Sequence, residues 1–268
     1  MFREYYGFSK NPFDKQSISV KDAFLSKDHK EMTSRLSYLN NIRGVGVFTS
    51  APGLGKTFAL RCFANSLDRN LNEVAYICLS TVSLREFYRQ FCVALGIDAP
   101  NGKPDMFRAI QDRLYHLFKE KRKPFVLLVD EAHELSTNIL NDLKMIMNYE
   151  FDSTNCFTLA LVGEPHLIHN LSKPPHEALR QRVAIHYSFS GLSDAETEQY
   201  LLHKLRIAGA ADSILGDGTL PAIIGFACGC PRLLDNLMNE ALKLGAQLEK
   251  PSLDTDVIMA AANNLALA

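Results

Sequence analysis

The sequence has no long apolar run and no excess of charge of either sign. Its 29 Lys and Arg residues nearly balance its 30 Asp and Glu residues, so no overall basic field predicts a nucleic-acid-binding surface. No apolar stretch approaches the roughly 18 residues that a transmembrane helix needs, and the first six residues do not resemble a signal peptide. We therefore expect a cytoplasmic protein without membrane association, in which any DNA contact depends on a local patch.

The six cysteines and the histidines show no pattern typical of a metal site. No C-x-x-C pair is present, and Cys228 and Cys230 are too close together for an ordinary zinc clamp. His133 has no partner at helical spacing, and His166 and His169 have no evident third ligand. We expect His166 and His169 to be solvated and the thiols to be reduced and buried.

A glycine-containing stretch predicts a phosphate-binding loop between an apolar run and an amphipathic run. Its residues are Ser50, Ala51, Pro52, Gly53, Leu54, Gly55, Lys56 and Thr57. In such a strand–loop–helix unit, backbone N–H groups and the helix N-terminus bind phosphate oxygens. Lys56 would reach the β- and γ-phosphates of a nucleotide, and the Thr57 hydroxyl would bind Mg²⁺. Ser50 replaces the usual first glycine, which a negative φ would permit. A turn that binds nothing is the alternative.

A second pattern places two carboxylates after a predicted strand. Residues 125–129 form an unbroken apolar run, typical of a strand buried on both faces of a parallel sheet, and Asp130 and Glu131 follow it. Ligands bind at the carboxyl ends of such strands. Asp130 would hold Mg²⁺ and its water shell, and Glu131 would polarise an attacking water. A solvated strand end explains the pair taken alone, but its position about 75 residues after a phosphate loop favours nucleotide hydrolysis.

The order of apolar runs predicts an α/β fold with a parallel sheet. The strands are expected at 45–49, 73–79, 125–129, 157–162 and 184–189. The helices between and before them are expected at 27–41, 57–68, 83–95, 105–121, 136–149 and 176–182. Alternating strands and helices form parallel sheets through right-handed crossovers.

The character of the sequence changes near residue 190. Beyond it, only helices are expected, at 195–208, 219–228, 231–247 and 253–265. Ser193 and Glu196 fit the capping box that would open the first of them. We therefore predict a nucleotide-binding α/β domain over residues 1–190, which includes the aromatic N-terminal segment, and a helical domain over residues 191–268.

Seven short segments, spread over almost the whole chain, match the motifs of one ATPase family in order. They are residues 5–8, 11–13, 50–57, 129–133, 161–165, 179–182 and 229–232. On these segments the chain resembles AAA+ ATPases, and more closely the ATPase module of general secretion pathway protein A and the related transposition helper ATPases. The resemblance implies an AAA+ P-loop NTPase fold with a five-stranded parallel sheet between helices and a small all-α lid. It also implies ATP and Mg²⁺ as ligands and self-association into a ring or helical filament.

The same resemblance implies roles for residues outside the loop. Phe58 and Arg232 would join the loop in binding ATP, with Arg232 in the place of the second sensor. Glu164 lies where the family often has Gln or Asn as the first sensor, and its carboxylate would repel a γ-phosphate unless it acts through water or a base. Arg180 and Arg182 lie where a finger would reach a neighbouring subunit's ATP, with Arg182 as first choice. Surface arginines paired with carboxylates are the alternative.

Two functions from different classes suit such an ATPase. The first is a transposition helper, whose ATP-bound filament coats double-stranded DNA and recruits a transposase. We favour it because the sequence stops at Ala268, without the membrane span and peptidoglycan-binding domain of the secretion relatives. Arg85, Arg89 and Lys103 would then contact DNA phosphates, although a solvated charged face explains each equally well. The alternative is a secretion or envelope-assembly ATPase that acts on a protein partner. A nucleotide switch without hydrolysis fits less well, because Glu131 is intact.

Overall fold

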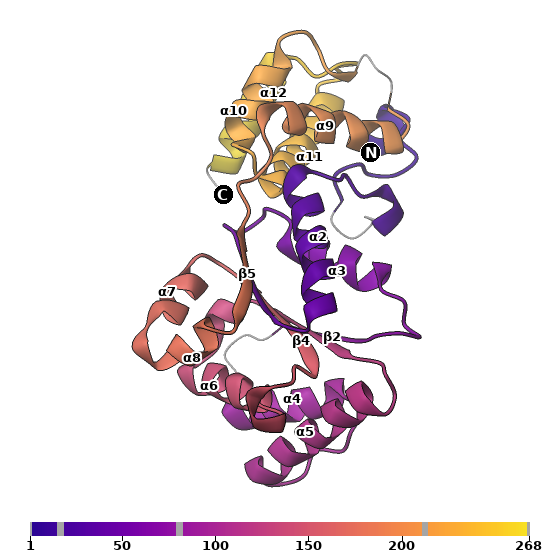
Figure 1. Cartoon of the computed structure of the whole chain (residues 1–268). Coiled ribbons are helices and arrows are strands. Elements are labelled where there is room, and N and C mark those ends of the chain that lie inside the picture. Colours follow the sequence, from indigo (N-terminus) through magenta and orange to yellow (C-terminus); the bar gives the residue numbers. More distant parts are fainter. Residues whose placement is uncertain (1, 15–18, 79–82, 211–213, 267–268) are drawn as a thin grey trace. The chain divides into compact units, whose positions relative to one another are not determined.

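The computed structural model of the chain describes residues 2–14, 19–78, 83–210 and 214–266. The chain divides into two compact units (Figure 1). The sheet unit consists of Glu31–Pro52 and Lys56–Phe189, and the helical unit consists of Met1–Lys30, Gly53–Gly55 and Ser190–Ala268. The N-terminal segment therefore groups with the C-terminal helices rather than with the sheet.

The sheet unit contains the predicted five-stranded parallel sheet. Its strands are β1 (Val45–Thr49), β2 (Glu73–Cys78), β3 (Phe125–Asp130), β4 (Phe157–Gly163) and β5 (Val183–Ser188). All neighbours pair in parallel, in the order β2-β3-β4-β1-β5. Every residue of β1, β3 and β4 is buried, which explains why these strands are apolar runs without alternation. The order places β4 between β1 and β3, so the segments that follow these three strands lie side by side at the carboxyl end of the sheet.

Helices cover both faces of the sheet. They are α2 (Lys27–Ile42), α3 (Lys56–Ser66), α4 (Leu84–Ala94), α5 (Lys103–Lys119), α6 (Thr137–Ile146), α7 (His166–Ser172) and α8 (Glu177–Arg180). Figure 1 shows α2 and α3 on one face and α4, α5 and α6 on the other. A Cβ on Gly46 would lie 2.6 Å from Leu39 Cδ2, so α2 packs closely on β1 because residue 46 has no side chain. The short helix α7 is not among the predicted elements.

The helical unit is built from α1 (Phe2–Tyr5), α9 (Asp194–Ile207), α10 (Thr219–Ala227), α11 (Pro231–Gln247) and α12 (Thr255–Ala266). The predicted capping box is confirmed, because the Ser193 and Glu196 side chains each bond the other residue's backbone N–H. Phe8 and Phe13 are buried in the core of this unit, at 6% and 0% exposure. Core packing thus accounts for these two aromatic residues of the N-terminal segment.

A buried polar trio lies inside the helical unit. The Tyr200 hydroxyl donates to Asp235 Oδ1 at 3.0 Å, and Lys204 Nζ lies 3.5 Å from Asp235 Oδ2. Lys204 is only 4% exposed, and this burial lowers its pKa while the Asp235 carboxylate opposes part of the shift. The trio joins α9 to α11 through one carboxylate that has a cation and a hydroxyl beside it.

The burial of the cysteines matches the expectation only in part. Cys62, Cys92 and Cys156 are buried as expected, but the expectation of buried thiols is wrong for Cys78 and Cys228. Cys78 ends the edge strand β2, and Cys228 caps α10 in a left-handed conformation, so both side chains are exposed.

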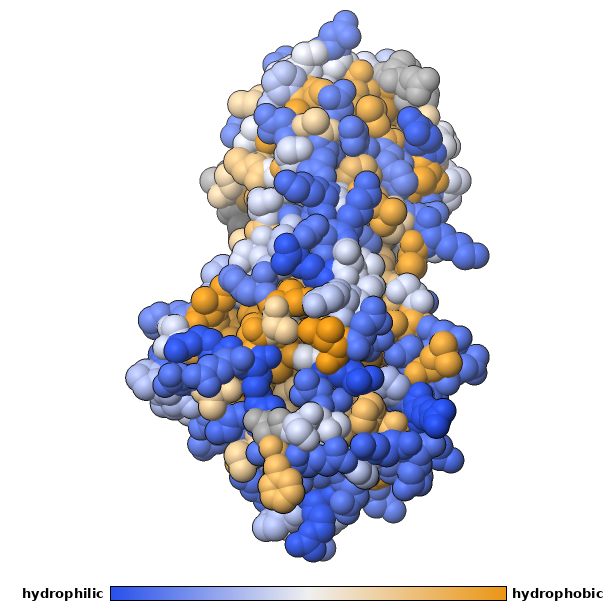
Figure 2. Space-filling view, in the orientation of Figure 1, coloured by the Kyte–Doolittle hydropathy of each residue, from blue (hydrophilic) through white to orange (hydrophobic). Residues whose placement is uncertain are grey.

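No helix within the described part of the chain is long and apolar enough to cross a membrane. On the face drawn in Figure 2, hydrophilic residues predominate and apolar residues occur in small groups.

Candidate active site

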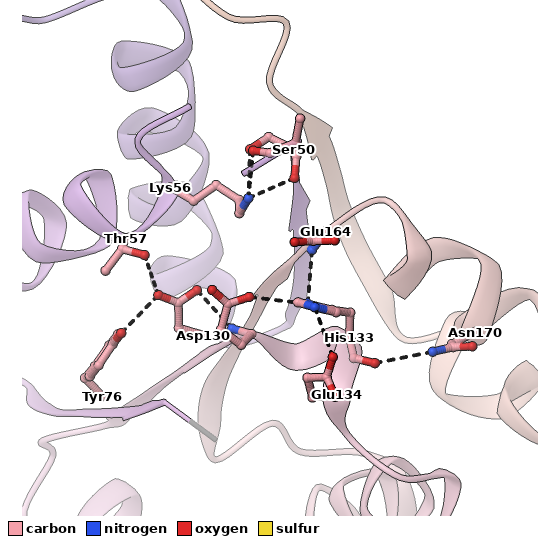
Figure 3. A network of polar contacts seen from close by, with 11 residues as sticks. Ser50, Lys56, Thr57, Tyr76, Asp130, His133, Glu134, Glu164 and Asn170 are labelled. Carbon is pink, nitrogen blue, oxygen red and sulfur yellow. Dashed lines mark hydrogen bonds and ion pairs between the residues drawn. The ribbon is translucent and has the colours of Figure 1, made fainter. Parts of the chain in front are cut away.

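Polar side chains gather in the sheet unit where β1, β3 and β4 end (Figure 3). Ser50 follows β1, Asp130 is the last residue of β3, and Glu164 follows β4. The register pairs Thr49 with Gly163, and the Ser50 N–H donates to the Gly163 carbonyl at 3.1 Å. The strand order therefore brings three segments that are distant in sequence to one edge, where open α/β sheets bind ligands.

The predicted phosphate-binding loop joins β1 to α3, and its lysine is held at the start of the loop. Lys56 Nζ donates to the Ser50 carbonyl at 2.8 Å, to Ser50 Oγ at 2.9 Å and to the Ala51 carbonyl at 3.2 Å. Ser50 is not among the described residues with positive φ, so the condition for a serine here is met. Gly53 and Gly55 have φ values of +85° and +96°, which glycine tolerates best. A phosphate at Lys56 would replace contacts that the loop carbonyls now make.

Within the helical unit, the residue predicted as the second sensor lies against a loop glycine. Arg232 is in the first turn of α11, after Pro231, and its backbone N–H donates to the Gly53 carbonyl at 3.4 Å. A Cβ on Gly53 would lie 2.8 Å from Arg232 Cβ and 3.0 Å from Cys230 Sγ. The absence of a side chain at Gly53 thus allows the start of α11 to approach this part of the loop.

The predicted metal ligands are in direct contact in the sheet unit. The Thr57 hydroxyl donates to Asp130 Oδ2 at 2.6 Å, and the Glu131 N–H donates to Asp130 Oδ1 at 3.0 Å. A hydroxyl and a carboxylate fit Mg²⁺, which proteins usually bind through one or two such groups together with waters and substrate phosphates. No cluster of three or more His, Cys, Asp or Glu side chains suited to a metal occurs among the described residues, so a cage made wholly of such side chains is not found there.

Tyr76, which no sequence pattern indicated, belongs to the same group. It lies on β2, and its hydroxyl donates to Asp130 Oδ2 at 3.0 Å (Figure 3). Burial and the nearby negative charge of Asp130 raise the pKa of Tyr76 well above its ordinary value, so it remains a protonated donor at neutral pH. The contact arises because β2 pairs with β3 over its full length, with Cys78 opposite Asp130. It joins residues 54 positions apart in sequence.

Glu131 occupies a conformation that non-glycine residues rarely adopt. Its φ and ψ are 53° and 34°, in the left-handed region, and it precedes the short 3₁₀ helix η2 (Ala132–Glu134). Such a conformation costs a non-glycine residue roughly 1–2 kcal/mol. The Glu131 side chain is 45% exposed, and its Oε2 lies 3.4 Å from His133 Nδ1. The turn thus places an accessible carboxylate beside the buried carboxylate of Asp130.

His133 connects the ends of β3 and β4. Its Nδ1 accepts the Glu164 N–H at 3.3 Å, and its Nε2 lies 3.4 Å from Glu134 Oε1. Its carbonyl accepts from Asn170 Nδ2 on α7 at 3.4 Å. The ring is only 12% exposed. No sequence pattern links His133 to Glu164, because their contact depends on the pairing of β3 with β4.

Other predicted residues lie elsewhere on the sheet unit. Arg180 ends α8, is exposed, and donates to the carbonyl of Ser172 at 3.0 Å, whereas the partly buried Arg182 lies between α8 and β5. The Arg61 guanidinium stacks over the Phe58 ring on α3. The finger role of an arginine and the nucleotide contact of Phe58 stay predictions.

The residues predicted to contact DNA lie on α4 and α5. Lys103 lies outside the helix predicted at 105–121, but it is the first residue of α5, because Pro104 suits the first turn of a helix. Lys103 Nζ forms an ion pair with Asp142 at 2.6 Å, and the exposed Arg85 donates to the Asn101 carbonyl at 3.1 Å. Arg89 is exposed on α4. The ion pair partly neutralises the charge that Lys103 would offer to a phosphate.

Comparison with known proteins places the chain in a family. The family model described as AAA domain matches residues 40–171. General secretion pathway protein A of Aeromonas hydrophila is 30% identical over 246 residues, which cover 90% of this chain and 44% of that protein. DNA polymerase III subunit gamma of Buchnera aphidicola subsp. Schizaphis graminum is 26% identical over 208 residues, which cover 77% of this chain and 53% of that protein. The chain thus spans about half the length of these curated relatives.

Solved structures share the fold at low sequence identity. Cdc6p from Pyrobaculum aerophilum has a TM-score of 0.69 and 18% identity, with 94% of this chain and 70% of that chain covered. The Aeropyrum pernix ORC1 protein, solved in complex with DNA, has a TM-score of 0.68 and 15% identity, with 96% and 70% covered. These similarities confirm the predicted α/β AAA+ fold, with a five-stranded parallel sheet and a C-terminal helical lid that includes α10, α11 and α12. Taken with the AAA-domain match and the 30% identity, they identify the chain as an AAA-domain protein homologous to general secretion pathway protein A.

Proposed function

We propose that the chain is a Mg²⁺-dependent ATPase of the general secretion pathway A type, which uses ATP hydrolysis to act on a protein partner. The observation that carries the ATPase proposal is the contact between Thr57 Oγ1 and Asp130 Oδ2 at 2.6 Å. It brings the end of β3 to the first turn of α3, where Lys56 and the loop amides are suited to phosphate binding. A hydroxyl, a buried carboxylate and an accessible carboxylate then lie beside one phosphate-binding helix.

Each residue of the group has a definite task in this proposal. Lys56 and the backbone N–H groups of the loop bind the β- and γ-phosphates of ATP, and Thr57 and Asp130 hold Mg²⁺ and its waters. Mg²⁺ supplies positive charge that offsets the charge developing on the phosphate oxygens. Glu131 orients and polarises the attacking water, a task that requires the accessibility of its carboxylate. Glu164, at the end of β4, lies between the other two strand ends and would respond to the γ-phosphate.

Assembly would complete the site. AAA+ proteins oligomerise, and an arginine from one subunit can stabilise the transition state at the next. We propose Arg182 for this role, with Arg180 second, because both belong to the segment that leads from α8 into β5. Hydrolysis per subunit should therefore rise with protein concentration in the wild type. An Arg182→Ala variant that sediments as the same oligomer should lack this rise, and an unchanged rise would assign the finger elsewhere.

The protein partner is proposed from general secretion pathway protein A, the relative whose match covers 90% of this chain and whose name places it in a secretion pathway. This similarity favours the second of the two functions expected from the sequence. The transposition-helper function, with double-stranded DNA and a transposase as partners, has less support, since Lys103 is engaged by Asp142.

Hydrolysis of ATP by the purified protein, with and without Mg²⁺, tests the ATPase proposal. The wild type should release phosphate only with Mg²⁺, and Lys56→Ala should lose nucleotide binding, measured by fluorescence of a labelled ATP analogue. Lys30→Ala, on the exposed surface of α2, is the matched control and should bind as the wild type does. Tight ATP binding by Lys56→Ala would contradict the assignment of the phosphate-binding loop.

A second measurement separates the two classes of partner. Duplex DNA is added to the protein with an ATP analogue, with ADP or without nucleotide, at two salt concentrations. We expect no nucleotide-dependent, salt-sensitive binding. Such binding, with filaments visible in electron micrographs, would contradict the secretion-type proposal and restore the transposition-helper function.

A further inference from the structure

His133 has one ring nitrogen with two competing partners. Nδ1 lies 3.4 Å from Glu131 Oε2, which can only accept a hydrogen bond when ionised, and 3.3 Å from the Glu164 backbone nitrogen, which can only donate one. A ring nitrogen either carries a proton and donates, or has a free lone pair and accepts. His133 Nδ1 therefore cannot satisfy Glu131 and Glu164 at the same time.

The two neutral tautomers of the ring select different partners. With the proton on Nε2, the ring accepts the Glu164 N–H at Nδ1 and donates to Glu134 Oε1, which lies 3.4 Å from Nε2. With the proton on Nδ1, the ring donates to Glu131, and the Glu164 N–H loses this acceptor. The Glu164 N–H and Glu134 therefore bond the ring in one tautomer, and Glu131 bonds it in the other. No partner is common to both tautomers.

The surroundings hold the ring between these partners. A Cβ on Gly163 would lie 3.0 Å from His133 Nδ1 and 3.1 Å from the His133 backbone nitrogen, so the end of β4 approaches the ring only because residue 163 has no side chain. Asn170 on α7 donates to the His133 carbonyl at 3.4 Å and anchors the backbone of η2 (Figure 3). The ring is 12% exposed, so few waters compete for its nitrogens.

We propose that His133 is a positioning residue that exchanges its Nδ1 contact between the Glu164 backbone and the Glu131 carboxylate, and so ties the aim of Glu131 to the position of the end of β4. The inference rests on the proposed ATPase function. A γ-phosphate near Glu164 displaces the end of β4 and weakens the hydrogen bond from the Glu164 N–H to His133 Nδ1. The ring then gives its Nε2 proton to water and takes a proton from water at Nδ1. From Nδ1 it donates to Glu131, whose 45% exposed side chain otherwise has freedom to point away from the attacking water. Glu131 is thereby aimed at water only when ATP is bound.

Isosteric substitutions distinguish the acting nitrogen. An asparagine amide atom occupies the place of Nδ1, and a glutamine amide atom occupies the place of Nε2. We expect His133→Gln to lower kcat for ATP hydrolysis by about tenfold with KM unchanged, as the loss of an outer-shell partner typically does. His133→Asn should stay within about threefold of the wild type, since most of the positioning contact is retained. The control is His169→Asn, an exposed histidine on α7. Equal losses in His133→Asn and His133→Gln, or a larger loss in His133→Asn, would overturn the proposal.

A double substitution shows whether His133 acts through Glu131. In single-turnover measurements, His133→Gln should slow hydrolysis in the wild-type background and leave the residual rate of Glu131→Gln unchanged. A further loss in the double variant would indicate a structural role and contradict the proposal.

Nitrogen NMR of the imidazole ring tests the exchange itself. In ¹⁵N-labelled protein, the His133 signals are assigned by their absence in His133→Gln. With Mg²⁺ and a non-hydrolysable ATP analogue, the proton should move from Nε2 to Nδ1, whereas ADP should leave it on Nε2. The same protonated nitrogen in both states would overturn the proposal. If the wild type hydrolyses no ATP and binds no analogue, the proposed ATPase function itself fails; if it hydrolyses ATP and the tautomer does not change, only this inference fails.

Discussion

The two units each bury an aspartate beside a tyrosine, but they balance its charge differently. In the helical unit, Asp235 accepts from Tyr200 and also has the Lys204 ammonium 3.5 Å away. In the sheet unit, Asp130 accepts from Tyr76 and Thr57, and the described residues offer it no ion pair. A buried carboxylate with its own cation holds helices together, whereas one surrounded only by neutral donors favours an external cation. Asp235 thus has a structural partner, whereas Asp130 has the surroundings expected of the metal ligand that we propose.

Removing either aspartate side chain should have the largest effect, and the property affected should differ between the two units. Asp130→Ala should lower Mg²⁺-dependent ATP hydrolysis by about a hundredfold or more, since it removes charge from the proposed metal site and the hydrogen-bond partner of Thr57. Its free energy of unfolding without nucleotide should change little, because the lost carboxylate is 1% exposed and forms no ion pair with a cation among the described residues. Phosphate release and urea denaturation measure the two quantities. A stability loss without a loss of hydrolysis would assign Asp130 a structural role.

The same substitution in the helical unit should show the reverse. Asp235→Ala should lower the free energy of unfolding by about 3 kcal/mol, because it leaves the Lys204 ammonium buried with its pKa already lowered by burial. Urea denaturation followed by circular dichroism gives the value. Glu198→Ala, on the exposed surface of α9, is the control and should unfold as the wild type does. An unchanged stability of Asp235→Ala would show that the trio is not a structural link.

The two tyrosines sharpen the comparison with smaller effects. Tyr76→Phe should weaken Mg²⁺ binding in the presence of ATP by about threefold, because Asp130 loses one of the donors that hold it in place. Tyr200→Phe should instead lower the free energy of unfolding by about 1 kcal/mol, the usual net value of a hydrogen bond. Mg²⁺ titrations of hydrolysis and urea denaturation check the pair. If Tyr76→Phe alters stability more than Mg²⁺ affinity, Tyr76 belongs with the structural group.

The smallest expected effect concerns an exposed carboxylate and depends on pH. The Thr154 hydroxyl, the Lys119 ammonium and the Tyr115 hydroxyl lower the pKa of Glu150 from 4.5 to about 2. A lowered folded-state pKa means that this contribution to stability is present above pH 4.5 and disappears as the pH falls towards 2. Glu150→Gln should therefore be slightly less stable than the wild type at pH 7, and the difference should vanish near pH 2. A difference that does not depend on pH would assign the effect to packing. The effect is small because water screens exposed groups.

The strands and the loop were predictable because their signals are local. The apolar runs at 125–129 and 157–162 predict strands buried on both faces. The observed β3 and β4 are each one residue longer than the predicted strand. Lys56, Thr57 and Asp130 were found because strand ends and glycine turns leave short patterns in sequence. Their roles in ATP hydrolysis are still predictions.

The contacts around these residues were not predictable, for a physical reason. Tyr76 reaches Asp130, and His133 reaches Glu164, only through the pairing of β2 with β3 and of β3 with β4. A tyrosine in a strand looks the same in sequence whether it faces solvent or a carboxylate. The helix α7 was not predicted because it has only seven residues and lies between Pro165 and Pro174, a spacing of prolines that is typical of a loop.

The left-handed backbone of Glu131 bears on how this position would respond to selection. If folding were the only requirement, glycine would be the favoured residue, because it adopts a φ of 53° without steric cost. A library that randomises residue 131 should therefore be enriched in glycine when it is sorted for thermal stability and in glutamate when it is sorted for ATP turnover. At this one residue, thermal stability and catalysis would reward different amino acids.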